Sequence, residues 1–333
     1  MSDQKPSQPK HILLADDGSQ HSQAAIQLIC DLPFPEDTHI TVVSVFTPLQ
    51  ASNHEALRES LEKSKACLYE RGLDVKTELI LGYPAEKIVE LAESLKPDMI
   101  IIGAKGLRAT LGILLGGVAQ QVVEYANQPV LVVRAPYKPI KGVLFATDGS
   151  EYSQRAADYL LTFPLPADAQ LHILHAVPPA PLPIQQIPAW SPVPDLVQPP
   201  AIYESEEAKK MVEQQFQRGK ELLEQTVKSL DLLGLTIVTE LVRGDAATEI
   251  INYLKKHPIE LVVVGSRGLG AVRGWLLGSV SRKIIHYSGC SVLVVKDQLS
   301  HQINVVELAG ERSHLDQPGL RPRSIFSCLL PVR

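Results

Sequence analysis

His11-Ile-Leu-Leu-Ala-Asp-Asp-Gly-Ser19 and Gly142-Val-Leu-Phe-Ala-Thr-Asp-Gly-Ser150 are two versions of one segment, an apolar run that ends in Asp-Gly-Ser. A second pair of matching segments, Gly72–Gly82 and Gly234–Gly244, follows further along the chain. The copies are 131 residues apart at the first pair and 162 at the second, so the second copy carries an insertion. Self-similarity of this kind is the signature of a repeated structural unit. The chain is therefore predicted to hold two copies of one fold.

The insertion in the second copy is rich in proline, with nine prolines between Pro178 and Pro200. Because proline fixes φ and lacks a backbone donor, residues 178–205 are not expected to form the interior of a sheet or helix. Two interpretations stay open. The segment is either a lid or partner-docking arm, or a tolerated surface insertion, since long loops cost little closure entropy.

The length of the chain also favours two domains, because 333 residues exceed the size of about 250 to 300 at which single cores stop growing. The composition, 45% hydrophobic and 21% charged, is ordinary for a globular protein. We expect residues 10–137 to form the first domain and residues 138–297 the second, including the insertion. Residues 298–333 are expected to be an irregular C-terminal tail.

Within each copy, short apolar runs alternate with helical patterns. Residues 85–95 show apolar side chains at a spacing of three to four, and Pro84 suits a first helical turn. Such alternation predicts βαβ units, hence a doubly wound, Rossmann-like α/β fold with a parallel sheet covered on both faces. The strands expected in the first copy are Ile12–Ala15, Ile40–Phe46, Val75–Leu81, Met99–Ile102 and Val130–Val133.

The last strands of the two copies, Val130–Val133 and Val292–Val295, are apolar at every position. Since an exposed apolar edge invites aggregation, we expect these two edges to pair with each other. The two copies would then form an internal pseudo-dimer within one chain. Whether the chain also forms a homo-dimer stays open.

Charge and cysteine content exclude several classes of protein. The net charge of -5 provides no positive field for nucleic acid. The four cysteines have no CxxC spacing, so neither a zinc site nor a disulfide framework is expected. The N-terminus lacks an apolar signal segment, and no run approaches the ~18 apolar residues of a membrane span. We therefore expect a cytoplasmic protein with no nucleic-acid, membrane or metal partner.

A glycine motif follows the fourth strand of each copy. The second copy reads Gly265-Ser-Arg-Gly268, nine residues, then Gly278-Ser279, and the first reads Gly103-Ala-Lys-Gly106, nine residues, then Gly116-Gly117. Bare glycine backbone lets N–H groups approach phosphate oxygens, and a helix N-terminus adds partial positive charge. The motif indicates a phosphate cradle, with close backbone packing as the alternative. Ser279 is expected to donate to a phosphate, to cap the following helix, or both.

A second set of polar residues consists of Asp17 and Asp148, each just after the first strand of its copy. A carboxylate at the carboxyl end of a parallel strand can accept hydrogen bonds from ribose hydroxyls. The alternative is an Asx-turn or a helix cap.

His172 and His175 lie an odd number of positions apart on a strand and should point to opposite faces, which argues against a paired site. Asp245 is expected to cap a helix.

Together, the Asp-Gly-Ser and Gly-x2-Gly-x9-Gly-Ser motifs resemble those of the universal stress protein family, over residues 10–135 and 140–297. The resemblance implies an adenine nucleotide alpha hydrolase-like fold and, in the ATP-binding branch of the family, a nucleotide site at the ends of strands one, two and four. In the second copy it implies Ala146, Asp148, Ala176, Val264, Gly265, Gly268, Gly278, Ser279 and Val280. In the first copy it implies a weaker set, Ala15, Asp17, Val45, Ile102, Gly103, Gly106, Gly116 and Val118.

The first copy departs from the family pattern because Gly117 stands where the family has Ser or Thr. The missing hydroxyl removes a hydrogen bond of about 1 kcal/mol or more, since hydrogen bonds to charged groups reach about 1.5 to 3 kcal/mol. Four cations flank the glycine motifs and are candidates to neutralise phosphates or to be solvated surface: Lys105, Arg108, Arg267 and Arg273.

The function expected from the resemblance is an ATP-binding stress-response or regulatory protein, with ATP bound mainly in the second copy and magnesium as its candidate counterion. The chain has no GxxxxGK[ST] loop, no GxGxxG after its first strand and no nucleophile elbow, so a P-loop hydrolase, a dehydrogenase and a serine hydrolase are not expected. The protein is therefore not expected to be an enzyme. The alternatives are a nucleotide-free dimeric scaffold and a slow ATPase, and the sequence identifies no regulatory protein partner.

Overall fold

The computed structural model describes residues 9–48, 54–107, 115–179, 206–269 and 277–296, and all five ranges belong to one compact unit. The strands are β1 (His11–Ala15), β2 (His39–Phe46), β3 (Asp74–Leu81), β4 (Met99–Gly103), β5 (Val130–Val133), β6 (Gly142–Ala146), β7 (Gln170–Val177), β8 (Thr236–Arg243), β9 (Leu261–Gly265) and β10 (Ser291–Val295). The helices are α1 (Gln20–Asp31), α2 (His54–Tyr69), α3 (Pro84–Leu95), α4 (Gly117–Tyr125), α5 (Glu151–Leu160), α6 (Glu206–Leu230), α7 (Ala246–Lys256) and α8 (Ser279–Tyr287), with a 3-10 turn at Asp231–Leu233.

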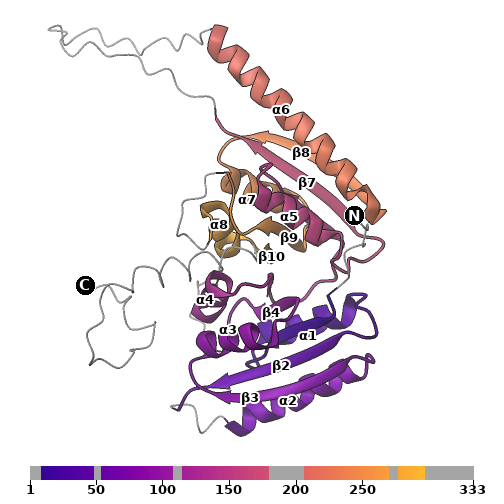
Figure 1. Cartoon of the computed structure of the whole chain (residues 1–333), viewed down its shortest axis with the longest axis vertical. Coiled ribbons are helices and arrows are strands. Elements are labelled where there is room, and N and C mark those ends of the chain that lie inside the picture. The colour runs from indigo at the N-terminus through magenta and orange to yellow at the C-terminus, as the bar shows by residue number, and fades with distance from the viewer. Residues whose placement is uncertain (1–8, 49–53, 108–114, 180–205, 270–276, 297–333) are drawn as a thin grey trace, which may run out of the picture. The chain divides into compact units, whose positions relative to one another are not determined.

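All described strands belong to one sheet of ten, in the order β3-β2-β1-β4-β5-β10-β9-β6-β7-β8 (Figure 1). Strands β1 to β5 form the first repeat and β6 to β10 the second. Pairing is parallel within each repeat, as the alternation of apolar runs and helices predicts. Both repeats have the same internal order, so the doubly wound α/β fold is confirmed.

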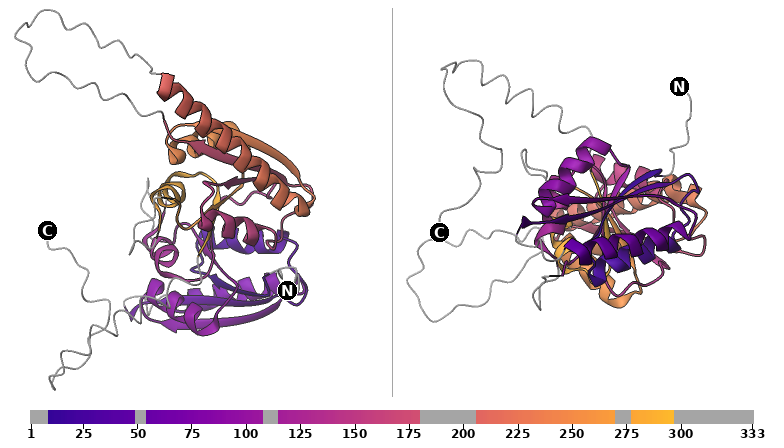
Figure 2. Two further views of the ribbon diagram at one scale, coloured as in Figure 1. Left: turned by 45° about the horizontal axis from the view of Figure 1, so that its top comes forward. Right: turned by 90° about the horizontal axis from the view of Figure 1, so that it is seen from below.

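Two hydrophobic layers hold the helices against the two faces of the sheet. Because side chains alternate along a strand, Ile12 and Leu14 of β1 enter one layer while Leu13 and Ala15 enter the other. The first layer packs against α1, α2, α5 and α6, and the second against α3, α4, α7 and α8. Figure 2 shows the helices of the first repeat, in indigo and violet, on both sides of its strands. Burial on both faces explains why these strands are continuously apolar.

The two repeats meet at β5 and β10, which pair antiparallel with Leu131 opposite Leu293. The expected pairing of the two apolar edges is therefore confirmed. A cation follows each of these strands. Arg134 donates from Nη2 to the backbone oxygen of Ile285 at 2.6 Å, and Lys296 donates from Nζ to that of Glu124 at 3.2 Å. Each cation thus reaches the last turn of the other repeat's final helix, where the helix dipole is negative.

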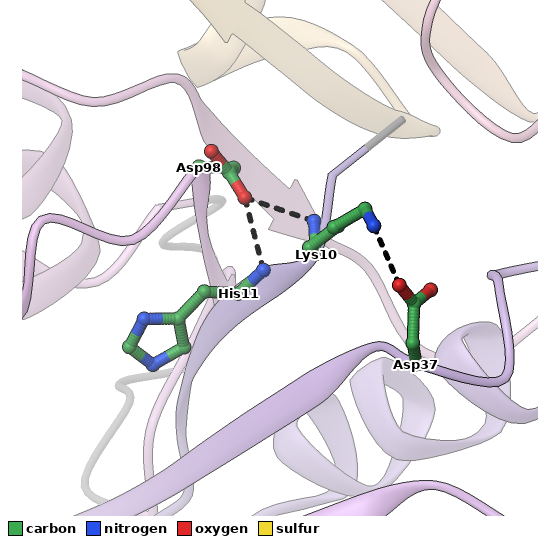
Figure 3. A network of polar contacts seen from close by, with 4 residues as sticks. All are labelled: Lys10, His11, Asp37 and Asp98. Carbon is green, nitrogen blue, oxygen red and sulfur yellow. Dashed lines mark hydrogen bonds and ion pairs between the residues drawn. The ribbon is translucent and has the colours of Figure 1, made fainter. Parts of the chain in front are cut away.

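An acidic residue fixes the start of the first strand in each repeat. Asp98 accepts hydrogen bonds through Oδ2 from the backbone N–H groups of Lys10 and His11, at 2.8 and 2.9 Å (Figure 3). Glu260 accepts equivalent bonds from residues 141 and 142 at 3.2 and 2.8 Å. The side chain of Lys10 forms a separate, exposed ion pair with Asp37 at 2.5 Å. Asp98 and Glu260 thereby fix the register of β1 against β4 and of β6 against β9.

The expected elements lie where predicted, within one residue at their ends. Pro84 is the first residue of α3, and the Asp245 side chain accepts from the N–H of Thr248 as the N-cap of α7. The two histidines of β7 point to opposite faces, as expected: His172 contacts Tyr253 of α7 at 2.7 Å, and His175 lies against Gly219 of α6. None of the described helices combines the length and apolarity needed to cross a bilayer.

Three expectations stay predictions. The proline-rich segment from residue 180 onward and the C-terminal tail from residue 298 lie outside the described residues. The boundaries at residues 10, 137/138 and 297 likewise remain expectations, because the described residues of both repeats share one compact unit.

Candidate functional site

Each repeat carries a cavity at the carboxyl ends of its parallel strands, the usual place for ligands in this kind of sheet. The cavity of the second repeat has a volume of about 330 Å³ and that of the first repeat about 780 Å³. The second cavity is lined by all nine residues predicted for that repeat, namely Ala146, Asp148, Ala176, Val264, Gly265, Gly268, Gly278, Ser279 and Val280. The first is lined by all eight predicted there, namely Ala15, Asp17, Val45, Ile102, Gly103, Gly106, Gly116 and Val118.

The two aspartates bridge the loops that border each cavity. Asp148 accepts from the N–H of Ser150 through Oδ1 at 3.0 Å and from the N–H of Leu269 through Oδ2 at 2.8 Å. Asp17 makes the same pair of contacts, with Ser19 at 3.0 Å and Leu107 at 3.1 Å. The Oδ1 contacts form the Asx-turn that the sequence left open. A carboxylate has about four lone-pair sites, so each aspartate keeps acceptor capacity for a ligand.

Neither aspartate caps a helix. The cap is the serine two residues later: the Ser19 side chain accepts from the N–H of Ser22, and Ser150 does the same for Ser153. The helix-cap interpretation of Asp17 and Asp148 is therefore wrong. The serines take the cap because they directly precede α1 and α5, which leaves the aspartates at the rim of the cavity.

The glycines of the motif have different roles. A Cβ on Gly265 would lie 2.7 Å from the backbone oxygen of Tyr152, and one on Gly103 would lie 2.8 Å from the backbone carbon of His21. Close packing of strand against helix thus accounts for these two glycines. A Cβ on Gly268 would instead meet Oδ2 of Asp148, so this glycine is what lets the loop approach the carboxylate.

The N-terminus of α8 forms the polar end of the second cavity. Gly278 is the N-cap, with no side-chain cap hydrogen bond, and Ser279 is the first helical residue. The expectation that Ser279 caps this helix is therefore wrong, because the extended backbone of the turn ends one residue earlier, at Gly278. The first N–H groups of a helix have no intrahelical partner, so those of α8 can face an anion here. The exposed Ser279 lies beside them.

A buried hydroxyl fixes this helix to the sheet. Ser281 Oγ donates to the backbone oxygen of Gly265 at 2.7 Å, and the side chain is almost fully buried. At the equivalent position the first repeat has Ala119, which is also buried. The second repeat therefore has a hydrogen bond between β9 and α8 that its counterpart in the first repeat lacks.

Two of the four cations that flank the glycine motifs line these cavities. Arg267 lines the second cavity, where its guanidinium lies 5.6 Å from the centre of the Tyr152 ring and donates to the Tyr152 hydroxyl at 3.3 Å. Lys105 lines the first cavity. Arg108 and Arg273 lie outside the described residues. Within the described ranges, no group of three or more His, Cys, Asp or Glu side chains is arranged to hold a metal ion.

The first cavity has an additional carboxylate, that of the buried Asp16. Asp16 is 3% exposed and accepts from the N–H of Gly18 at 2.8 Å and from the hydroxyls of Ser60 and Ser64 at 3.2 and 2.7 Å. The second repeat has Thr147 at the position of Asp16. Further along α2, Glu59 and Lys63 also line the first cavity, one acidic and one basic. The two cavities therefore share most of their motif residues, but three carboxylates and two lysines line the first, whereas one carboxylate and one arginine line the second.

The lining residues that the motifs did not reveal come from helices packed over the sheet. Ala246 and Ile250 of α7 close the apolar side of the second cavity, together with Leu174 of β7. In the first cavity Ile88 of α3 has the same place as Ile250. Their helical periodicity predicts burial but does not separate a core position from a cavity wall.

Comparison with known proteins assigns both repeats to one family. The model described as "Universal stress protein family" matches at residues 9–134 and 139–296. Universal stress protein MJ0531 of Methanocaldococcus jannaschii is 35% identical over 168 residues, 50% of this chain and 87% of that protein. Universal stress protein YxiE of Bacillus subtilis is 30% identical over 154 residues, 46% of this chain and 97% of that protein.

Solved structures show the tandem fold as well. PA1789 of Pseudomonas aeruginosa, described as functionally unknown, matches with a TM-score of 0.63 at 17% identity, covering 91% of this chain and 98% of that chain. A universal stress protein from Archaeoglobus fulgidus matches with a TM-score of 0.56 at 20% identity, covering 87% of this chain and 97% of that chain. At these identities the likeness concerns the fold alone.

Proposed function

The chain belongs to the universal stress protein family, and on that premise we propose that it is a regulatory protein of the stress response whose second domain binds ATP. The observation that carries the proposal is the convergence of nine residues from β6, β7, β9, α8 and their loops on one cavity. The resemblance to the family implies these same nine residues, and they come from segments up to 134 positions apart, from Ala146 to Val280.

The residues that line the cavity are of the three kinds that an adenine nucleotide requires. Ala146, Ala176 and Val264 provide an apolar wall suited to an adenine ring. Asp148 lines the same cavity, and its remaining lone pairs can accept from ribose hydroxyls. Gly268, Ser279 and the N-terminus of α8 form the polar end, where backbone N–H groups and the helix dipole favour phosphate. In the family's ATP-binding branch, residues of these three kinds meet the adenine, the ribose and the phosphates.

The first domain is proposed to bind ATP more weakly. Gly117 removes the hydroxyl that Ser279 supplies in the second domain, and Asp16 adds a carboxylate near the site. A negative group disfavours a polyphosphate through like-charge repulsion. Equivalent motif positions around a larger cavity, without this hydroxyl and with an added carboxylate, support a weaker site.

Binding without turnover fits the residues that line the second cavity. Among the described lining residues, Asp148 alone carries a carboxylate or imidazole, and its remaining acceptor capacity is proposed to meet the ribose. A hydrolase needs a group that orients or deprotonates water. The proposal therefore assigns ATP a regulatory role, in which occupancy stabilises the second domain.

A nucleotide-free scaffold is the second candidate, favoured by the packing role of Gly103 and Gly265. Thermal and urea unfolding of the purified chain with ATP separates the two functions. A ligand at 100 times its Kd should add about 2.7 kcal/mol to the free energy of unfolding. Asp148→Ala should abolish this gain and Asp17→Ala should preserve most of it. Unchanged stability of the wild type at millimolar ATP would favour the scaffold.

A further inference from the structure

Two cysteines of the first domain lie against each other on neighbouring helices. Cys30 is in the last turn of α1 and Cys67 in the last turn of α2, and their Sγ atoms are 3.7 Å apart. Both are free thiols in this structure. Since a disulfide has an S–S length of about 2.05 Å, the two sulfurs need to approach by less than 2 Å to bond.

The two cysteines differ in their exposure to solvent. Cys67 is exposed and Cys30 is partly buried, so the two thiols are not equally accessible to a reagent. Burial, together with the hydrogen bond to Cys67, raises the pKa of the Cys30 thiol to about 12. Arg71 and Asp31 form an ion pair at 3.8 Å beside them, linking the ends of the same two helices.

We propose that Cys30 and Cys67 are a reversible disulfide pair, oxidised by a peroxide and reduced by a dithiol. The exposed Cys67 thiolate attacks one peroxide oxygen and cleaves the O–O bond, which leaves a sulfenic acid on Cys67 and releases water once protonated. The Cys30 thiol then loses its proton, its sulfur attacks the Cys67 sulfur, and the hydroxyl leaves as a second water. Each sulfur loses one electron, and the two peroxide oxygens gain the two electrons.

The second domain cannot form this link. Where the first domain has Cys30 and Cys67, the equivalent positions of the second are Leu161 and Ser229, at the repeat offsets of 131 and 162. The link is therefore a property of the first domain and not of the shared fold.

The disulfide would join α1 to a helix that borders the first cavity. Helix α2 lines that cavity and donates to the buried Asp16 through Ser60 and Ser64. Closing the pair ties the other end of α2 to α1 across 37 positions of sequence. Oxidation should therefore reduce the mobility of α2, measured as slower amide exchange in residues 54–69.

The test is mass spectrometry of the full chain after treatment with hydrogen peroxide. We expect a mass decrease of two hydrogen atoms, restored by dithiothreitol, and a tryptic peptide pair that joins Cys30 to Cys67. The Cys290→Ser variant is the matched control and should form the same link. In Cys30→Ser, which leaves the exposed thiol in place, Cys67 should gain oxygen atoms instead.

Circular dichroism establishes that each variant is folded before oxidation. If Cys30→Ser does not fold, Cys67→Ser, altered at an exposed position, serves in its place and should show no internal link. Oxygen addition to Cys67 in the wild-type chain without a Cys30–Cys67 peptide would overturn the proposal. A link from either residue to another cysteine would overturn it equally.

Discussion

Asp148 Oδ2 accepts a hydrogen bond from the backbone N–H of Leu269 at 2.8 Å, and this contact joins the loop after β6 to the glycine loop after β9. Only a residue without Cβ fits between them at position 268. The carboxylate that is proposed to meet the ribose therefore also sets the position of the loop that is proposed to meet the phosphates.

Gly268→Ala should lower ATP affinity at least tenfold. The added methyl group displaces the Asp148 carboxylate and breaks its bond to Leu269. Equilibrium dialysis with labelled ATP measures the loss. Gly106→Ala makes the same change beside Asp17 in the first domain and should leave the tight site unchanged. Equal losses in the two variants would contradict the assignment of the tight site to the second domain.

Gly117→Ser should improve nucleotide binding by the first domain. A Cβ at Gly117 meets no atom within 4 Å among the described residues, so the side chain has room. The added hydroxyl supplies a hydrogen bond to phosphate of about 1 kcal/mol, which corresponds to roughly fivefold in affinity. Binding is compared with that of Gly117→Ala, which fills the same space without a donor. Identical affinities for the two variants would argue against a role for this hydroxyl.

Substitution of Ser279 should affect ATP binding, whereas substitution of Ser281 should affect the stability of the protein. Ser279→Ala removes an exposed hydroxyl at the cavity and should weaken ATP binding while leaving urea unfolding unchanged. Ser281→Ala removes the buried donor to Gly265 and should cost about 1 to 3 kcal/mol of stability. The assignment fails if Ser279→Ala destabilises the apoprotein as much as Ser281→Ala does.

Lys296 should make stability depend on pH. Burial and, to a smaller degree, nearby Arg267 lower the pKa of Lys296 to about 8 from an ordinary value of 10.5. Between these two values the unfolded chain binds more protons, so the free energy of unfolding should rise as the pH increases from about 8 to 10.5. Urea unfolding of the wild type and Lys296→Met measures this, and the variant should lack that part of the rise. If the free energy of unfolding depends on pH in the same way in the wild type and in Lys296→Met, the lowered pKa of Lys296 is contradicted.

Sequence patterns predict much of the fold for physical reasons that the structure makes plain. Met99–Ile102 is apolar at every position because β4 is buried on both faces. The pairing of β5 with β10 follows from the same logic, since an apolar edge strand needs a partner. Asp17, Asp148, Gly103 and Gly265 could also be predicted, because they stand at or just after the carboxyl ends of parallel strands. The residues at the N-termini of α4 and α8 are implied by the family resemblance.

Other features could not be predicted from local patterns. The cap of α8 is decided by where the backbone turns, so Ser279 and Gly278 are equally plausible until the turn is seen. The contact of Asp16 with Ser60 and Ser64 depends on how α2 packs over the sheet. The meeting of Cys30 with Cys67 likewise depends on tertiary packing, because spacing along the chain does not reveal a pair on two neighbouring helices.

The most direct measurement of the central claim is an isothermal titration of the nucleotide-stripped chain with ATP, in the presence and absence of magnesium. The account predicts one tight site per chain, lost in Asp148→Ala and retained in Asp17→Ala. A second, weaker site in the wild type would locate to the first domain and should disappear in Asp17→Ala. Absence of binding up to millimolar ATP, or a tight site that survives Asp148→Ala, would contradict the account.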